Sequence, residues 1–440
     1  MRSQKSKIVV VGAGFAGLRT VLNLARANAD ILLIDRQNYH TFVPLLYQVA
    51  SGFIAPETIS YPLRRILRNI TNARFLQAEV KSINFAAKII QTDRVVVPYD
   101  YLVLATGSQT KFLGVDGAPE YSLPLRTLAD AVKLRDRILT NVDKAACESD
   151  AERRQQLLTF VIVGGGATGV ELAGALIELI TETLAKDYPR LDLRSMRLIL
   201  INSGERLLAT FPEDLGEYAG RQLRRRGVKI HYSTRVSCVM PGAVELDDGT
   251  MIETANVIWA AGVEANLPNG DSQLPTAKQD RICVHSTLQI LEHPEVYAVG
   301  DVAYVKQDGE PLIGVAPEAL QQGTAVAKNL TRQLRGLSPQ PFDYFNKGTA
   351  AIIARNAGVA YLFGRIPLKG FFAWLLWLSI HLYYLPGDAN RFALLFSWIR
   401  DYIFKERRVR QIFAFHEASL SNVQDVNSHR LQSHIQNPGD

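Results

Sequence analysis

Two short glycine-rich stretches carry the clearest chemistry in this chain. In the first, Gly12, Gly14 and Gly17 follow the apolar run at residues 7–11, and apolar residues at helical spacing come directly after them. The first glycine permits a tight turn, the second lets a phosphate approach the backbone, and the third lets helix and strand pack closely. The free N–H groups of the helix N-terminus then face the anion. This stretch therefore predicts a site for a dinucleotide pyrophosphate.

An acidic residue stands where a ribose would need it. Asp35 closes the next apolar strand, with Arg36 beside it. A carboxylate about twenty residues beyond the loop can accept hydrogen bonds from the hydroxyls of an adenosine ribose. A glycine turn alone could be purely structural, but the strand, the helix and the acid together favour a nucleotide site.

The second stretch repeats the first. Gly164, Gly166 and Gly169 follow the apolar run at residues 159–163 and open another helix-like segment. The strand that comes next ends at Asn202, where an acid would be expected. Asparagine can bond a ribose hydroxyl without repelling a 2′-phosphate, so NADPH is acceptable beside NADH.

The alternative to Asn202 is a shifted alignment in which Glu205 takes the acid's place, with Arg206 close in sequence. Two further strand ends support a second nucleotide. Thr106 and Gly107 follow one apolar strand, and Gly300 and Asp301 follow another. A carboxylate at the end of such a strand can bind a polyol such as the ribitol of FAD, although Asp301 could equally cap a helix.

These residues require a particular set of elements. Strand, glycine turn, helix and strand occur twice, about 150 residues apart, as in a parallel α/β sheet built from βαβ units. We therefore expect an α/β fold with two Rossmann-like dinucleotide-binding domains and a C-terminal amphipathic-helix segment that anchors to a membrane. The expected boundaries are 1–120 with 280–335 for the FAD domain, 121–279 for the NAD(P)H domain, 336–417 for the C-terminal membrane-anchoring and dimer region, and 418–440 for a polar tail.

Composition is that of a folded protein of ordinary hydrophobicity. The 440 residues have a net charge of +6, with 47% hydrophobic and 21% charged residues. The basic excess between Arg391 and Arg410 is interleaved with aromatic residues, which favours an anionic lipid surface over nucleic acid. Three separated cysteines form no C-x-x-C, so neither a zinc site nor a redox disulfide is expected, and a cytosol-facing compartment follows.

The segment Gly370–Leu385 is uncharged and aromatic, and Pro386 and Gly387 end it. As a helix it measures about 24 Å, which is short for a hydrocarbon core of about 30 Å. An amphipathic helix with basic residues follows, and three of the four tryptophans lie in this block. An in-plane membrane anchor fits best. The alternatives are a buried dimer interface, a core helix and a true span.

The sequence resembles the two-dinucleotide-binding-domain flavoproteins and, among them, the type II NADH dehydrogenases, which are single-chain, non-proton-pumping NAD(P)H:quinone oxidoreductases. The matching segments run in family order and include VVVGAGFAGL, DRQNYHTFVPLLYQVASG, LVLATGS, VIVGGGATGVELAGAL, VYAVGDVA, APEALQQG and KGTAAIIARNAGVA. The aromatic C-terminal block also matches. The NYHTFVPLLYQVASG segment and this block are more specific than either glycine loop.

The resemblance implies roles for individual residues. FAD would be held by Gly12, Gly14, Gly17, Asp35, Arg36, Thr106, Gly107, Gly300 and Asp301, and the nicotinamide nucleotide by Gly164, Gly166, Gly169, Asn202 and Gly262. Glu171 matches an acid near nicotinamide and flavin, Gln321 and Gln322 match glutamines at the quinone pocket, and Lys347 matches a cation near the isoalloxazine. Pro317 stands where the family often has glutamine, at the quinone end.

The function implied is hydride transfer from NADH or NADPH through FAD to a membrane quinone, which could be plastoquinone, ubiquinone, menaquinone or a naphthoquinone. We expect a peripheral, monotopic protein on a cytosol-facing membrane surface, in contact with anionic lipid and forming a homodimer, with no nucleic acid partner and no metal. The alternatives are naphthoquinone reduction in phylloquinone synthesis, a low-turnover flavin redox sensor of the apoptosis-inducing-factor type, and a soluble flavin reductase.

Overall fold

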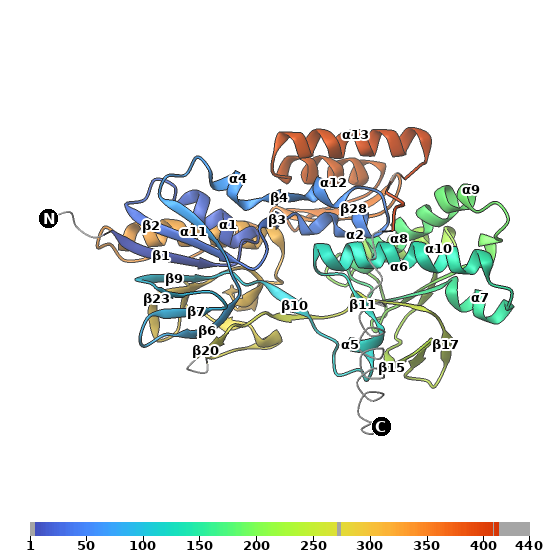
Figure 1. Ribbon diagram of the computed structural model, residues 1–440, viewed down its shortest axis with the longest axis horizontal. Coiled ribbons are helices and arrows are strands. Elements are labelled where there is room, and N and C mark those ends of the chain that lie inside the picture. Colours follow the sequence, from blue (N-terminus) through green and yellow to red (C-terminus); the bar gives the residue numbers. More distant parts are fainter. Residues whose placement is uncertain (1–4, 271–273, 408, 413–440) are drawn as a thin grey trace, which may run out of the picture.

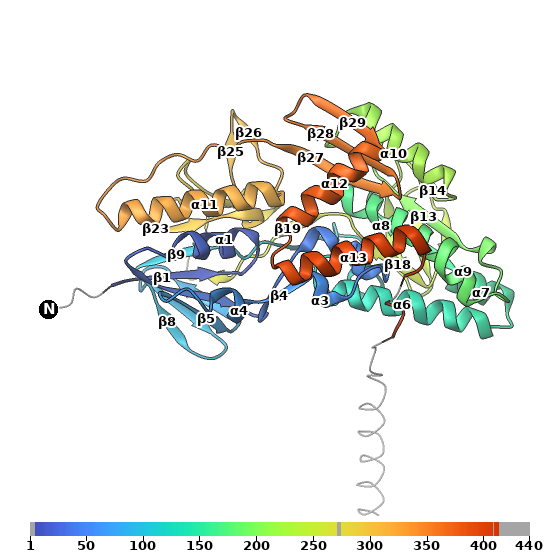
Figure 2. The ribbon, with the colours of Figure 1, turned by 90° about the horizontal axis from the view of Figure 1, so that it is seen from above.

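The computed structural model describes residues 5–270, 274–407 and 409–412, so the expected polar tail at 418–440 lies outside the described residues. Figure 1 shows two α/β units lying side by side, with a pair of C-terminal helices at the top, above the region where the two units meet. Figure 2 looks down on that pair and shows it over the middle of the molecule.

The first unit is built on a six-stranded sheet in the order β22-β23-β9-β1-β2-β5, parallel except for β22. Its strands are β1 (Ser6–Val11), β2 (Ala29–Asp35), β5 (Ala73–Gln77), β9 (Tyr101–Leu104), β22 (Gln289–Ile290) and β23 (His293–Ala298). The central strands are almost wholly apolar and buried, as a sheet covered on both faces requires. Helices α1 (Phe15–Asn23) and α11 (Ala316–Gln333) pack together beside it.

The second unit repeats this plan with a five-stranded parallel sheet in the order β11-β18-β12-β13-β14. Its strands are β11 (Leu123–Pro124), β12 (Thr159–Val163), β13 (Arg197–Ile201), β14 (Lys229–His231) and β18 (Asn256–Trp259). Its helices are α6 (Leu128–Cys147), α7 (Ala151–Leu157), α8 (Ala167–Glu178) and α10 (Glu213–Arg225). A π-helical stretch (Leu179–Leu184) and α9 (Ala185–Asp187) extend α8.

The C-terminal part begins with an antiparallel sheet of β27 (Gly348–Ala354), β28 (Ala357–Leu362) and β29 (Ile366–Gly370). Helix α12 (Phe371–Tyr384) packs on β28, and α13 (Asp388–Phe404) follows a short turn. A side chain at Gly358 would lie 2.6 Å from the backbone nitrogen of Trp374, so α12 sits as close to the sheet as backbone allows. No helix in the described ranges is both long and apolar enough to cross a bilayer.

Smaller elements join these parts. They include β3 (Tyr39–Thr41), α2 (Leu46–Ala50), α3 (Pro56–Ile59), β4 (Ser60–Pro62), α4 (Leu63–Leu67), β6 (Val80–Asn84), β7 (Ile89–Thr92), β8 (Val96–Pro98), β10 (Ser108–Thr110), α5 (Ala118–Tyr121), β15 (Val236–Met240), β16 (Ala243–Leu246), β17 (Met251–Glu253), β19 (Val263–Ala265) and β20 (Asn269–Gly270). Strands β10 and β19 pair antiparallel along the connections between the two units. The α/β prediction with two parallel-sheet units is confirmed.

Candidate functional site

The first glycine loop has the geometry that its spacing predicts. Gly12 has φ +102°, and a side chain there would overlap the carbonyl oxygen of Ala105. A side chain at Gly17 would overlap the carbonyl of Gly12. At Gly14, by contrast, an added Cβ would have no heavy atom within 4 Å. The protein therefore requires glycine at 12 and 17 for its own packing, and the space at 14 is open for a bound group.

Asp35 is fixed beside this loop. One carboxylate oxygen (Oδ2) accepts from the backbone N–H of Ala13 at 2.6 Å and the other (Oδ1) from that of Gln37 at 2.7 Å. Burial raises the pKa of Asp35, while both backbone bonds oppose that shift. Arg36 points to solvent, and its carbonyl accepts from Gln77.

A dinucleotide group also needs donors, and Thr106 supplies one. Its hydroxyl (Oγ1) is buried and has no hydrogen-bond partner among the residues that the structure describes. Gly107 follows with φ +71° and open space around it. A buried hydroxyl left without a partner is costly, so a bound polar ligand would satisfy it. The open cradle at Gly14 and this hydroxyl both fit a bound FAD.

Asp301 begins a turn after β23, and its Oδ2 accepts from Ser108 Oγ at 2.8 Å and from Arg126 Nη2 at 2.6 Å. Arg126 also contacts Ser108 Oγ. Arg126 is a residue that reasoning from sequence missed, because it precedes α6 of the second unit and belongs to no motif. In the sequence, Arg126 stands out only as an isolated basic residue between two turns.

The two glutamines of α11 bond to backbone. Gln322 is buried, and its Oε1 accepts from the N–H of Gly300 at 2.6 Å, so it holds the turn that carries Asp301. Gln321 donates to the carbonyl of Phe345 at 2.9 Å and accepts from its N–H at 3.0 Å. Both side chains therefore position neighbouring segments in this structure.

Lys347 and Pro317 lie together at a groove of about 360 Å³ between α11 and the segment before β27. Arg19, Gln321 and Tyr384 also line it. This groove shares no lining residue with the cavity that contains Glu171, described below. Of the four residues expected to act around flavin and quinone, Gln321 and Lys347 therefore line this groove, Glu171 lines the other cavity, and Gln322 is among the described lining of neither.

The second glycine loop copies the first. Gly164 has φ +117°, a side chain at Gly169 would overlap the carbonyl of Gly164, and Gly166 again faces open space. Gly262, after β18, has φ +74° and lies close to the carbonyl of Lys111. This loop can thus take a second pyrophosphate.

Asn202 directly follows β13, whereas Asp35 is the last residue of β2, and the two side chains make different hydrogen bonds. Its Nδ2 donates to the carbonyl of Gly204 at 2.8 Å and to that of Arg206 at 2.9 Å. The side-chain amide therefore orders the segment that follows the strand. This segment contains Glu205, whose side chain is exposed.

Glu171 lies in α8, two residues beyond the last loop glycine, and is buried. Its Oε1 accepts from Trp377 Nε1 at 3.1 Å and from the backbone N–H of Ile352 at 3.2 Å. Burial raises the pKa of Glu171 to about 8, against the opposing effect of these two bonds. The carboxyl group therefore carries a proton at neutral pH.

Glu171 faces a cavity of about 450 Å³ between α8, β27 and the two C-terminal helices. Apart from a few polar groups, its wall is aliphatic and aromatic. The lining residues include Tyr47, Phe53, Phe371, Trp374, Leu375, Leu378, Leu382, Leu395, Trp398, Ile399, Tyr402 and Ile403. Such a cavity suits a largely apolar molecule with a polar group that meets Glu171.

A buried group of charges holds α13 onto α8. Arg407 donates to the carbonyls of Ser51 and Ala175 at 3.1 and 2.7 Å and pairs with Glu178 at 3.1 Å. Arg355 pairs with Asp401 of α13 at 2.9 Å and also with Glu182. Removing one partner of a buried ion pair leaves an uncompensated charge, so this cluster fixes the helix in one place.

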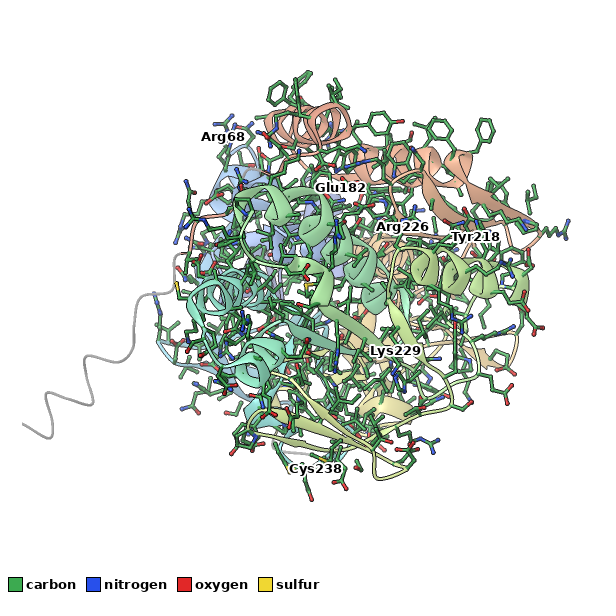
Figure 3. The ribbon with its side chains drawn as sticks, turned by 90° about the vertical axis from the view of Figure 1, so that its right-hand side faces the viewer. Arg68, Glu182, Tyr218, Arg226, Lys229 and Cys238 are labelled. Carbon is green, nitrogen blue, oxygen red and sulfur yellow. The ribbon has the colours of Figure 1, made fainter. Side chains whose placement is uncertain are left out.

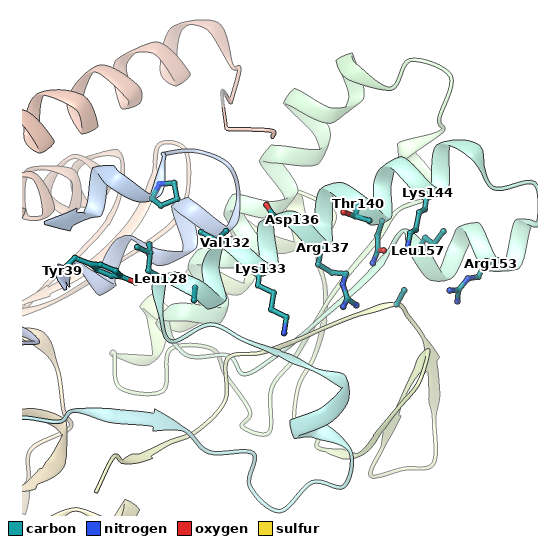
Figure 4. A pocket seen from close by; sticks show the side chains of 14 residues that line it. Tyr39, Leu128, Val132, Lys133, Asp136, Arg137, Thr140, Lys144, Arg153 and Leu157 are labelled. Atoms are coloured by element: carbon teal, nitrogen blue, oxygen red, sulfur yellow. The ribbon is translucent and has the colours of Figure 1, made fainter. Parts of the chain in front are cut away.

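A larger groove of about 770 Å³ follows α6 on another part of the surface. Figure 4 shows Lys133, Arg137 and Arg153 pointing from its wall. None of the residues assigned to nucleotide or quinone is among its described lining residues.

The comparisons with known proteins agree with this geometry. The family model for pyridine nucleotide-disulphide oxidoreductases matches residues 6–323. A type II NADH:quinone oxidoreductase, Ndh of Mycobacterium tuberculosis, is 36% identical over 419 residues, which are 92% of this chain and 89% of that protein. One from Staphylococcus aureus is 30% identical over 379 residues, covering 84% of this chain and 92% of that protein.

Among solved structures, NDH2 of Plasmodium falciparum in complex with NADH has a TM-score of 0.85 at 20% identity and covers 92% of this chain and 100% of its own. The sulfide:quinone oxidoreductase of Aquifex aeolicus has a TM-score of 0.68 at 19% identity, over 91% of this chain and 96% of its own. At these identities the structures establish the fold.

The fold and the paired glycine loops define a pyridine nucleotide-disulphide oxidoreductase, a flavoprotein class that works with FAD and a nicotinamide nucleotide. Within that class, this chain belongs to the type II NADH:quinone oxidoreductases. The recognition from sequence, the assignment as an enzyme and the cofactors FAD and NADH are thereby confirmed. Cys147, Cys238 and Cys283 are all free in this structure.

Proposed function

We propose that this protein is a membrane-peripheral enzyme that passes reducing equivalents from NADH through FAD to a membrane quinone. FAD, when bound, would accept hydride from NADH and deliver two electrons to the quinone. The first loop, with Asp35, Thr106 and Asp301, would hold FAD in the domain formed by residues 1–120 and 280–335. The second loop would hold the nicotinamide nucleotide in residues 121–279, and NADPH remains a prediction.

The observation that carries the proposal is the apolar cavity with a protonated acid at one end. A quinone has an apolar ring and tail, and its oxygens take up protons when it is reduced. Glu171 holds a proton at neutral pH and is oriented by Trp377 and Ile352. We propose that a quinone enters between α12 and α13 and that Glu171 holds or transfers a proton at its oxygen.

Membrane attachment is supported by the outer face of α12 and α13. The side chains of Phe372, Tyr383 and Phe392 are 75%, 73% and 73% exposed, and Phe396, Ile399, Ile403 and Phe404 join them. Figure 3 shows ring-bearing side chains projecting from the top of these helices. An exposed apolar face of this size, rich in aromatic residues, fits the interfacial region of a bilayer. The cytosol-facing side and the homodimer stay predictions.

Blocking the cavity tests this proposal. Ser379 lines the cavity and donates to the carbonyl of Leu375 at 2.9 Å. Ser397 on α13 makes the equivalent bond to Ala393 at 2.8 Å but lies outside the lining. We expect S379W to lower steady-state reduction of a short-chain quinone about tenfold or more, while NADH still bleaches the flavin. S397W should behave like the wild type.

Equal quinone turnover in S379W and S397W would contradict entry through this cavity. A purified protein that binds FAD and is reduced by NADH, but turns over negligibly with every quinone, would instead favour the low-turnover sensor. Turnover confined to naphthoquinones would favour a role in phylloquinone synthesis.

A further inference from the structure

Helix α4 of the first unit presents three arginines on one surface. Leu63 and Leu67 are buried and attach the short helix to the core. Arg64, Arg65 and Arg68 are all exposed. The sequence pattern of two leucines with arginines between them thus becomes a cationic face on an anchored element.

Two of these arginines are aimed by aromatic rings. The guanidinium of Arg64 lies 5.3 Å from the ring centre of Phe75, and that of Arg65 lies 5.4 Å from the ring centre of Tyr61. Stacking on a ring leaves the N–H donors at the guanidinium edge free for an anion. In the described part of the chain, no carboxylate lies within ion-pairing distance of Arg64, Arg65 or Arg68.

The segment directly before α4, formed by α3 and β4, touches the turn between α12 and α13. A side chain at Gly387 would lie 2.5 Å from the ring of Tyr61, so that ring packs directly on the turn. Asn390 of α13 donates to the carbonyls of Thr58 and Ser60 at 3.0 and 3.3 Å. Figure 2 shows α4 and β4 beside one end of α13 when seen from above, and Figure 3 shows Arg68 next to that helix.

The basic residues of the C-terminal block are largely engaged within the protein. Arg391 donates to the carbonyls of Leu385 and Tyr383 and pairs with Asp388. Arg407 is buried in the charge cluster described above, and Arg410 pairs with Asp187. Lys405 is exposed at the far end of α13. Among the described cations of this block, Arg391, Arg407 and Arg410 therefore have partners within the protein, whereas Arg64, Arg65 and Arg68 form no ion pair with a described carboxylate.

We propose that Arg64, Arg65 and Arg68 bind the phosphate groups of anionic phospholipids beside the apolar face of α12 and α13. This inference rests on the proposed membrane attachment, and it adds polar contacts to the apolar contacts of α12 and α13. Arginines at the edge of an inserted aromatic face would lie at headgroup depth, where guanidinium bonds phosphate bidentately. The first unit, and not only the C-terminal helices, would then orient the enzyme on a charged membrane.

The test uses full-length holoenzyme and two triple variants of equal charge change. The first is R64Q/R65Q/R68Q. The control is K133Q/R137Q/R153Q, which removes three exposed cations from the α6 groove. Flotation with phosphatidylcholine vesicles, with and without phosphatidylglycerol, measures partitioning at several salt concentrations. Each basic residue near an anionic surface contributes about 1 kcal/mol, so partitioning into anionic vesicles should fall on the order of 100-fold in the first variant.

The first variant should also lose much of the salt dependence of binding, keep the wild-type partitioning into phosphatidylcholine alone, and oxidise NADH with a water-soluble quinone at the wild-type rate. Equal losses in both triple variants would overturn the site, because net charge would then be the cause. So would an equal loss on uncharged vesicles. A wild-type protein that binds no vesicle of either composition would refute the membrane attachment itself, which is a separate outcome.

Discussion

The two glycine loops share the same backbone features but lie in different surroundings. Gly12 and Gly164 both have strongly positive φ, of +102° and +117°, and the third glycine of each loop packs against the carbonyl of the first. The helices that follow differ. Helix α1 is covered by α11 and exposes Arg19 two residues after its last glycine, whereas α8 buries Glu171 at that position.

The difference shows that one phosphate-binding motif can be used in two ways. In the first unit, we propose that Asp35, Thr106 and Asp301 hold the ligand around the glycine loop. The second unit continues its loop helix into the cavity and then, through Glu178, into the charge cluster that secures α13. Helix α8 therefore connects the second glycine loop physically to the C-terminal helices.

The largest loss of stability is expected where the helix after each glycine loop packs against its neighbouring element. A side chain at Gly174 of α8 would overlap the carbonyl of Ile353 in β27, and one at Gly323 of α11 would overlap that of Ala16 in α1. Since backbone must move in both cases, we expect G174A and G323A each to lower the free energy of unfolding by about 3 kcal/mol. Denaturant unfolding at saturating FAD measures this.

The matched control is G166A, at a position with open space and φ −74°. It should change the free energy of unfolding by less than about 0.5 kcal/mol. If G166A destabilised the protein as much as G174A, close approach of α8 to β27 would not be what the glycine provides.

Most of the fold follows from local patterns. Buried β-branched runs at residues 7–11 and 159–163 predict central parallel strands, and the glycine spacing predicts both turns, because these features depend on neighbours in sequence. The break at Pro386 and Gly387 separates α12 from α13 as expected. The segment 141–157, whose charged sequence is compatible with a linker or a helix, forms the end of α6 and α7.

The contacts that complete the site could not be predicted in this way. Trp377 reaches Glu171 from 206 residues away, Arg126 reaches Asp301 from 175, and Arg407 reaches Glu178 from 229. Each pairing depends on how separate units pack, which periodicity does not encode. The internal partners of Arg391 and Arg407 likewise become visible only in three dimensions, and contact of the basic C-terminal block with lipid stays a prediction.

Filling the open space at Gly14 or at Gly166 should affect the binding of FAD and of NADH separately. G14V and G166V each place a side chain where the protein itself has no atom within 4 Å of the added Cβ. We expect G14V to lower FAD affinity on the order of 100-fold and G166V to raise the KM for NADH similarly. Flavin content after dialysis and initial rates measure the two effects. Loss of flavin in G166V, with normal flavin content in G14V, would reverse the assignment of the loops.

The buried acid of α8 gives a pH signature that α1 lacks. Because the pKa of Glu171 is raised to about 8, its proton is present below that pH and lost above it. Quinone turnover should therefore decline as pH rises through about 8. E171Q should lower turnover about tenfold and abolish that decline, while E171D should restore a pH-dependent limb. An unchanged profile in E171Q would remove Glu171 from proton handling.

The same pKa makes a statement about stability. A carboxyl group whose pKa is higher in the folded than in the unfolded protein favours the folded state while it is protonated. This contribution to the free energy of unfolding is present at low pH and is lost as pH rises towards 8. In E171Q the free energy of unfolding should therefore fall less between pH 5 and 8 than in the wild type. Urea unfolding at matched pH values checks the sign independently of activity.

The smallest effect should come from exchanging Asp35 and Asn202, which stand at the ends of β2 and β13. Asp35 accepts from Ala13 and Gln37, so D35N keeps one acceptor but loses charge, and FAD affinity should fall about fivefold, or ~1 kcal/mol. Asn202 donates to Gly204 and Arg206, which an aspartate cannot do. N202D would instead face two carbonyl oxygens and disorder the segment after β13. Its KM should therefore rise for NADH and NADPH alike, by about fivefold. If N202D instead lowered the KM for NADH and raised it only for NADPH, Asn202 would be a simple ribose ligand like Asp35, and the two loops would differ less than their hydrogen bonds indicate.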